Sequence, residues 1–305
     1  MKKRRQEGNR RAAGVWYYVL IAMLIIIGLG ALGYPFLSTL WNDYRNRQLM
    51  SSYDSDVAAL SPAEVNIIWE DARAYNAHHR VNNPVDPFSV EKEAYIKTHP
   101  YDDLLNPSGN GVMGELEIPK IGVRLPIFHG TGRKALEQGC GHLMGTSLPT
   151  GGKGNHAVLS AHRGLPSAKL FTDLDQLRKG DYFYLHILNK VLAYRVDQIR
   201  TVLPEDSRDL AIDPNQDYVT LVTCTPYGVN THRLLVRGRR TAYKPAAQKK
   251  SGNIFEQLFG RTGMTEKIFL TGLFILALII AVMLLIYRLT SRRKKEQKID
   301  RPPTT

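Results

Sequence analysis

The stretch from Tyr218 to Arg240 reads YVTLVTCTPYGVNTHRLLVRGRR and contains two strand patterns joined by a turn. The first pattern is rich in β-branched and aliphatic residues and ends on Cys224, and a second pattern begins at about His232. The Pro-Tyr-Gly sequence between them is a turn signal. The sequence therefore predicts a β-hairpin that places Cys224 and Arg233 at the facing ends of its two strands.

A thiol beside a guanidinium group has a chemical use. A nearby cation favours the thiolate form of the cysteine. The fixed N–H donors of arginine can hold a carbonyl oxygen or the oxyanion formed from it. A single cysteine in an apolar strand is, however, more often a small buried hydrophobic residue. The hairpin alone therefore leaves a catalytic role for Cys224 open.

Two segments together resemble the active-site signatures of the sortases, the cysteine transpeptidases of Gram-positive cell surfaces. One is TLVTC at Thr220 to Cys224, with Arg233 nine residues further on, and the other is LSAHRG at Leu159 to Gly164. This resemblance implies that Cys224 is the nucleophile and that His162 is its acid/base partner. It also implies that Arg233 steadies the carbonyl group of the substrate.

Short strand patterns separated by turn residues fill residues 111–242, the region of the resemblance. This spacing is typical of a closed β-barrel. The expected fold is therefore mainly β, a sortase-like closed barrel with short helices. The predicted strands are 112–118, 123–128, 156–161, 182–187, 191–199, 218–223 and 232–237, and the predicted helical patches are 134–138 and 168–177.

Residues 38–80, before the barrel, show helical periodicity. The sequence Ser-Pro-Ala-Glu at positions 61–64 is a capping box with proline at the first helical position, so a second helix is expected to begin there. These two helices are a spacer in the simplest interpretation. They also resemble the N-terminal helices of class C, the pilus-building sortases.

Residues 81–110 gather proline, asparagine, aspartate and glycine, and include Asp86, Pro87 and Phe88. This tripeptide resembles the lid motif of class C sortases, which implies that Asp86 pairs with Arg233 and that Phe88 covers Cys224. The alternative is a tether that only links the helices to the barrel. Faster thiol labelling of Cys224 in Asp86→Ala and Phe88→Ala variants would favour the lid, and unchanged labelling would favour the tether.

Two apolar runs, residues 15–37 and 267–288, are each long enough to cross a hydrocarbon core of about 30 Å as a helix. The first could be a cleavable signal peptide, but it is longer than the usual apolar region of one and no small-residue cleavage site closes it. We therefore expect two membrane spans, the second preceded by a linker at 243–266.

The net charge of +13 lies mostly at the two ends of the chain. Six basic residues and one acid at positions 1–11 give +5, and seven basic residues and two acids at 288–301 give another +5. Basic residues beside membrane spans mark the cytoplasmic side and meet anionic lipid. The charge therefore argues for membrane lipid and against nucleic acid as a partner. It predicts cytoplasmic tails at 1–14 and 289–305, with the catalytic part outside the cell membrane.

Cys140 and Cys224 are the only cysteines in the chain, so the extracellular part is not a disulfide scaffold. A bridge between them is formally possible in an oxidising compartment, but it would consume the proposed nucleophile. A buried free thiol is the preferred interpretation of Cys140.

Nine histidines are present, but no paired Cys-x-x-Cys or His-Glu-x-x-His sequence accompanies them, so neither a metal nor a cofactor is expected. His156 shares the parity of His162 on one predicted strand and competes with it for the acid/base role. His162 is preferred because it ends the strand, where a side chain can reach a cleft. His129 and His142 have weaker claims.

The resemblance implies a transpeptidation in which Cys224 cleaves a Leu-Pro-x-Thr-Gly type sorting signal between Thr and Gly. The acyl group would then pass to a lysine amine of a pilin subunit, so pilins or other surface proteins with such signals are the expected partners. The alternatives are attachment of surface proteins to cell-wall peptidoglycan, hydrolysis by the same thiol, and a non-catalytic surface module.

Overall fold

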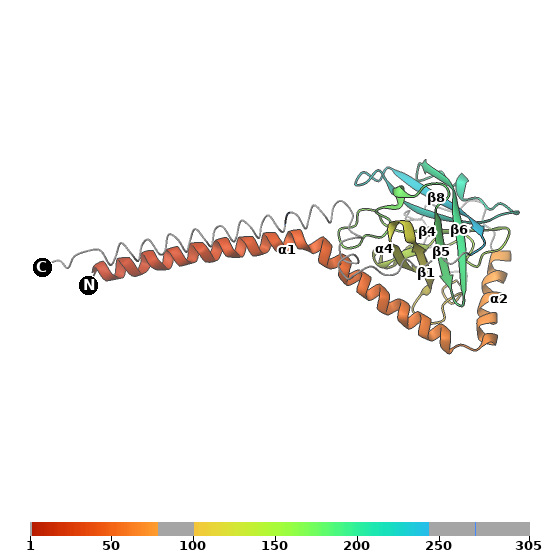
Figure 1. Cartoon of the computed structure of the whole chain (residues 1–305), viewed down its shortest axis with the longest axis horizontal. Helices are drawn as coiled ribbons and strands as arrows, with labels where there is room; N and C mark the ends of the chain where they lie inside the picture. The colour runs from red at the N-terminus through yellow and green to blue at the C-terminus, as the bar shows by residue number, and fades with distance from the viewer. Residues whose placement is uncertain (1, 79–100, 244–271, 273–305) are drawn as a thin grey trace. The chain divides into compact units, whose positions relative to one another are not determined.

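The computed structural model describes residues 2–78, 101–243 and 272 (Figure 1). The barrel, α2 and the part of α1 that begins at Pro35 belong to one compact unit, Pro35–Gln248. The elements in chain order are α1 (Lys2–Ala59), α2 (Pro62–His78), β1 (Val112–Ile118), η1 (Pro119–Ile121), β2 (Val123–Phe128), α4 (Arg133–Gln138), β3 (Cys140–His142), β4 (Asn155–Ser160), η2 (Leu174–Gln176), β5 (Tyr182–Ile187), β6 (Lys190–Val202), η3 (Arg208–Leu210), β7 (Asp217–Thr225) and β8 (His232–Thr241).

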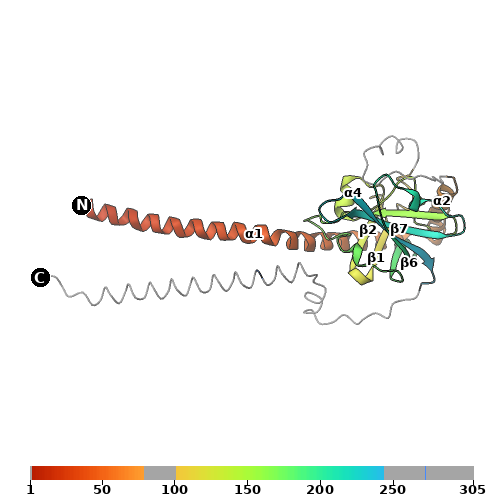
Figure 2. The same cartoon turned by 90° about the horizontal axis from the view of Figure 1, so that it is seen from above.

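Eight strands form a closed barrel in the order β1-β2-β3-β4-β7-β8-β6-β5. Figures 1 and 2 show the barrel from two directions. The pairs β2–β3 and β4–β7 are parallel, and the other neighbouring strands are antiparallel. Closure removes the exposed strand edges that an open sheet would leave. The closed barrel predicted from the sequence is confirmed.

The predicted strands are all present, although β6, β7 and β8 are longer than expected. The three-residue strand β3 was not predicted, because it is too short to show an alternating pattern. The helix predicted at 168–177 is wrong, since only the short 3-10 helix η2 forms there. Leu170 has a positive φ of 43°, a conformation that an α-helix cannot contain.

Side chains alternate between two faces of the barrel wall, as they do in any β-strand. On β7, Val219 and Leu221 belong to the main core inside the barrel, whereas Val222 belongs to a second cluster. We call this second cluster the outer apolar cluster. Its buried members are Leu143, Val158, Leu210, Val222 and Leu235.

The helix α2 packs against the barrel through a buried face. Trp69 is 2% exposed, belongs to the main core and donates from Nε1 to Oδ1 of Asn189 at 3.2 Å. The predicted capping box is confirmed at the start of α2. The Ser61 amide donates to Oε2 of Glu64 at 2.8 Å, and the Glu64 amide donates to Oγ of Ser61 at 3.3 Å. A helix start is therefore fixed immediately before the residues that meet the barrel.

The helix α1 is continuous in secondary structure and contains Pro35. Among the described residues, no single helix is long and apolar enough to cross a membrane. A pair bent by 41°, Met23–Pro35 and Leu37–Ala59, meets the requirement only when the two parts are taken together. The span expected at 15–37 is therefore not supported here as a single transmembrane helix. The second expected span, the linker and the C-terminal tail lie outside the described residues apart from 243 and 272.

His156 generates a prediction about stability. Burial lowers the pKa of its imidazole to about 4 from the usual 6.5. Below pH 6.5, His156 is therefore protonated in the unfolded chain, whereas in the folded chain it stays neutral until about pH 4. Over this interval we expect the folded state to lose about 3 kcal/mol through this one group. Urea unfolding at pH 7, 6, 5 and 4 should show this loss, and His156→Gln should remove much of the pH dependence while lowering stability at pH 7. An identical pH dependence in the two proteins would contradict the assignment.

Candidate active site

The hairpin of β7 and β8 brings Cys224 directly opposite Arg233 in the antiparallel ladder. Residues that face each other in this way extend their side chains from the same face of the sheet. Both residues are half-buried. Nη1 of Arg233 donates to the carbonyl oxygens of Asn230 and His232, each at 3.2 Å, which holds the guanidinium group at this end of the hairpin. The hairpin predicted from the sequence is thus present, with the expected residues paired.

His162 reaches the same place by a different pairing. The strands β4 and β7 are parallel, and Ser160 at the end of β4 pairs with Val222. Two residues beyond this pair come His162 on one strand and Cys224 on the other. The parallel path continues past the ladder, because the Ala161 amide donates to Val222 O at 3.2 Å and Thr223 Oγ1 donates to Ala161 O at 2.8 Å. The register therefore sets His162 beside Cys224.

Cys224, His162 and Arg233 continue the face that carries the outer apolar cluster. By strand alternation, His162 follows Val158 on this face and Cys224 follows Val222. Next to Arg233 lies a small pocket with a mostly apolar lining. It is lined by Val202, Leu203, Pro204, Asp206, Ser207, Leu210, Val222, Arg233 and Leu235. The guanidinium group of Arg233 therefore borders this pocket, and the thiol and the imidazole lie on the same face of the sheet.

The half-buried position of His162 changes its acid/base chemistry. Burial lowers the pKa of the imidazole, and the nearby Glu137 carboxylate of α4 opposes that shift. The neutral imidazole is therefore favoured at neutral pH. In this form the ring can accept a proton from a thiol and later return it to a leaving group.

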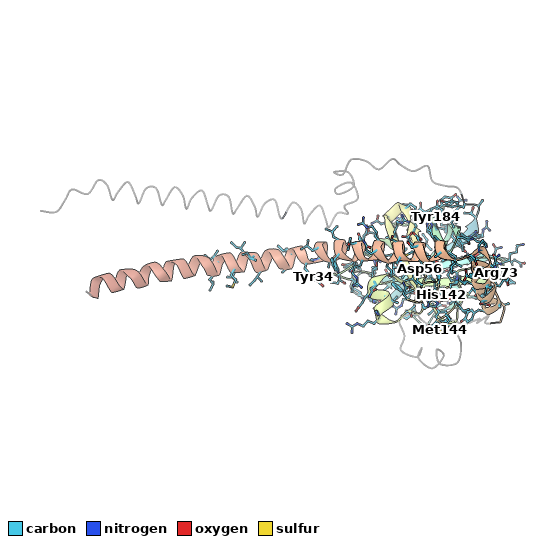
Figure 3. The ribbon with its side chains drawn as sticks, turned by 90° about the horizontal axis from the view of Figure 1, so that it is seen from below. Tyr34, Asp56, Arg73, His142, Met144 and Tyr184 are labelled. Atoms are coloured by element: carbon cyan, nitrogen blue, oxygen red, sulfur yellow. The ribbon has the colours of Figure 1, made fainter. Side chains whose placement is uncertain are left out.

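The other histidines considered for the acid/base role have hydrogen-bond partners away from Cys224. His156 is 1% exposed and lies at the other end of β4, where Nδ1 faces Ala211 O at 2.9 Å and Nε2 faces Thr220 Oγ1 at 2.7 Å. His142, drawn in Figure 3, is fully buried, with Nδ1 2.6 Å from Tyr101 Oη. His129 contacts two backbone carbonyl groups through its ring nitrogens. Position alone therefore favours His162.

Cys140 is a fully buried free thiol, as interpreted from the sequence. Its Sγ donates to Pro126 O at 3.4 Å, and burial raises the pKa of the thiol. A thiol that resists deprotonation is a poor nucleophile. Cys224 is only half-buried and forms no disulfide bridge with Cys140, so the two thiols differ strongly in accessibility.

Sequence reasoning did not single out the residues that support His162. Arg163 donates from Nη1 to Thr225 Oγ1 at 3.1 Å and forms an ion pair with Asp175. In the loop that follows Arg163, the backbone is also held by α1, because Asn42 donates from Nδ2 to Ser167 O at 2.6 Å. The only available signal was that Arg163 directly follows His162. The proposed lid residues Asp86, Pro87 and Phe88 lie outside the described residues, and their role stays a prediction.

Comparison with known proteins agrees with this arrangement. Residues 116–241 match the family model described as the sortase domain. Crystal structures of sortase C-1 from Streptococcus pneumoniae and sortase C1 from Streptococcus agalactiae are each similar at 45% identity with a TM-score of 0.58. Each comparison covers 65% of this chain and 100% of the other.

Curated relatives are similar over the barrel. Sortase A of Streptococcus agalactiae is 37% identical over 117 residues, which are 37% of this chain and 47% of that protein. Sortase A of Bacillus anthracis is 32% identical over 127 residues, which are 42% of this chain and 59% of that protein. The chain thus spans about half the length of these curated relatives.

The roles assigned to Cys224, His162 and Arg233 lead to a prediction about acyl transfer. Arg233→Lys keeps the positive charge but loses the planar pair of donors, so we expect thioacyl formation on Cys224 to slow by about 100-fold. Cys224→Ala should abolish the adduct and His162→Ala should slow it severely, with thermal unfolding close to that of the parent protein. Mass spectrometry after incubation with a Leu-Pro-x-Thr-Gly peptide measures the adduct. A near-normal rate in Arg233→Lys would reduce Arg233 to a positional role.

Proposed function

Because the chain belongs to the sortase family of cysteine transpeptidases, we propose that it cleaves Leu-Pro-x-Thr-Gly type sorting signals and joins pilin subunits through isopeptide bonds. The observation that supports the proposal is strand register, since Cys224 pairs with Arg233 and His162 follows the Ser160–Val222 pair by two residues. The similarity to class C structures over 65% of the chain supports a pilin as the substrate class.

The first half of the reaction forms a thioester. The sulfur of Cys224 attacks the carbonyl carbon of the threonine in the signal while His162 takes up the thiol proton. Arg233 donates hydrogen bonds to the oxygen as it becomes negatively charged. The C–N bond to glycine then breaks, and His162 returns its proton to the departing amine.

The second half transfers the acyl group to an acceptor. A lysine amine attacks the thioester carbon, its proton passes to His162, and the C–S bond breaks to regenerate Cys224. An amine held close to the thioester competes with water through its effective concentration, which can reach about 10⁵ M in well-oriented systems. The choice between transpeptidation and hydrolysis therefore depends on positioning of the acceptor.

A small pocket beside Arg233 presents apolar surface to the acyl half of such a signal. Its lining includes Val202, Leu203 and Leu235. Apolar surface of the signal that is buried there contributes roughly 25 cal/mol per Å². A peptide that passes over this pocket would run beside Arg233.

We also propose that the protein acts at the cell membrane with the barrel outside and both termini in the cytoplasm. The support is the apolar run at each end of the chain together with +5 on each terminal segment. Protease added to intact cells should digest the region between the apolar runs and spare both termini. Digestion of either terminus from outside would overturn this topology.

A polymerisation assay tests the proposed function. Cells that express the full chain with a candidate pilin should show a ladder of covalent multimers on a denaturing gel, and Cys224→Ala should show none. Mass spectrometry of the ladder should find threonine joined to a lysine side chain. Threonine joined to a peptidoglycan stem peptide would instead identify a wall-anchoring enzyme, and free threonine ends would identify a hydrolase. If Cys224→Ala still forms these products, the thiol mechanism is excluded.

A further inference from the structure

The segment that follows His162 is anchored at its base. The Phe171 amide donates to His162 O at 3.1 Å, and the Gly164 amide donates to Thr172 Oγ1 at 3.2 Å. We call residues 162–175 the histidine loop. The two contacts close the loop on itself but do not attach it to the strand that carries Cys224.

Arg163 supplies that attachment. It lies 62 residues before Thr225, the same separation that pairs Ser160 with Val222 in the parallel ladder. Its guanidinium group donates to Thr225 Oγ1 at 3.1 Å and pairs with the carboxylate of Asp175 at the end of the histidine loop. One side chain therefore holds both ends of the histidine loop and the residue after Cys224.

Arg163 acts from the opposite side of the barrel wall to the reacting groups. Consecutive residues of a strand point to opposite faces. Thr225 thus lies on the face of Leu221 and Thr223, toward the barrel interior, and Cys224 lies on the outer face. Because the guanidinium group is bonded to Thr225, it contacts the interior end of the strand rather than the thiol. Arg163 is accordingly a candidate positioning residue and not a catalytic one.

The environment of Arg163 is a poor one for stability alone. Its side chain is only 9% exposed, and its Nε is buried with no hydrogen-bond partner among the described residues. An unsatisfied buried donor destabilises the folded state. A well-packed apolar residue at such a site is often as stabilising as a buried ion pair or more so. Stability alone therefore does not explain a charged residue here, whereas its two contacts fit a geometric role.

A second contact holds the histidine loop against the turn after β7. Gly164 has a φ of 76°, and a Cβ placed there would lie 2.8 Å from Cε2 of Tyr227. The Tyr227 ring thus packs directly on the backbone that follows Arg163. This close approach leaves little room for the histidine loop to move toward the turn after Cys224.

We propose that Arg163 is a positioning residue that keeps His162 in register with Cys224 by tying the histidine loop to Thr225. The inference rests on the proposed function, because it takes His162 and Cys224 to be the reacting pair. It predicts that loss of Arg163 leaves the thiol and the imidazole present but misaligned. A misplacement of about 1 Å in such a pair can slow a reaction by about 100-fold.

The test compares Arg163→Ala, Arg163→Lys and Thr225→Val with His162→Ala in the full-length protein. Two quantities are measured: kcat and KM with a Leu-Pro-x-Thr-Gly peptide, and the pH profile of Cys224 alkylation by iodoacetamide, with buried Cys140 as the unreactive internal reference. Arg163→Ala should lower kcat by about 100-fold with KM changed by less than about threefold. Its alkylation profile should shift toward that of His162→Ala.

The conservative variants separate positioning from folding. Thr225→Val keeps the shape of the side chain but removes the hydroxyl group, so it should produce a smaller shift in the same direction. Arg163→Lys should recover part of kcat, because an ammonium group can contact Thr225 or Asp175 but cannot reproduce the fork to both. If Arg163→Ala does not fold, these two variants decide the matter. Parent-like kcat and alkylation profiles in both would overturn the proposal.

Arg237→Ala is the matched control. Arg237 also forms a two-pronged ion pair on β8, with Asp197 at 3.1 and 2.9 Å, and its side chain is 21% exposed. Its loss should lower the melting temperature while leaving the alkylation profile unchanged. The same profile change in Arg237→Ala would show a general effect of destabilisation and overturn the role of Arg163. If His162→Ala itself leaves the profile unchanged, the proposed reacting pair fails rather than Arg163 alone.

Discussion

The parallel pairing of β4 with β7 is the constraint on which the site depends. From Asn155–Asp217 to Ser160–Val222, each residue of β4 lies beside the residue 62 positions later. A slip of one residue would move every side chain of the strand to the other face. His162 would then point into the barrel while Cys224 stayed outside. The many buried contacts of the main core hold this register, so the fold as a whole fixes the relation between imidazole and thiol.

The reacting residues and the residues that support them lie on opposite faces of the barrel wall. The outer face carries Cys224, His162 and Arg233 beside the outer apolar cluster. The inner face carries Thr223, whose hydroxyl group binds Ala161 O at 2.8 Å. Polar groups on the inner face satisfy backbone groups at the point where the ladder stops, which removes the cost of leaving them buried and unpaired. Among the reacting side chains, Arg233 also bonds backbone groups, the carbonyl oxygens of Asn230 and His232.

The sequence revealed what depends on neighbouring residues. β-Branched runs and turn residues predicted the strands, and the capping box at Ser61 predicted the start of α2. The strand β3 was not predicted, because three residues are too few to show an alternating pattern. The helix predicted at 168–177 did not form, because Leu170 has a positive φ. The contact of Arg163 with Thr225 was not predicted either, because parallel pairing joins residues 62 positions apart and no local pattern encodes that separation. The resemblance to a known family located His162 and Cys224, but only the ladder explains why they meet.

Backbone hydrogen bonds contribute to the preorganisation of the site, together with the side-chain contacts of Arg163. His162 is held on one side by Ala161, whose amide donates to Val222 O, and on the other by its own carbonyl group, which accepts from Phe171. Arg233 is held by the carbonyl groups of Asn230 and His232. Donors fixed before the substrate arrives need not reorganise as charge develops, and this is the main source of electrostatic catalysis. Because backbone groups and the Arg163 side chain supply this order, the reacting side chains can be half-exposed and still keep one geometry.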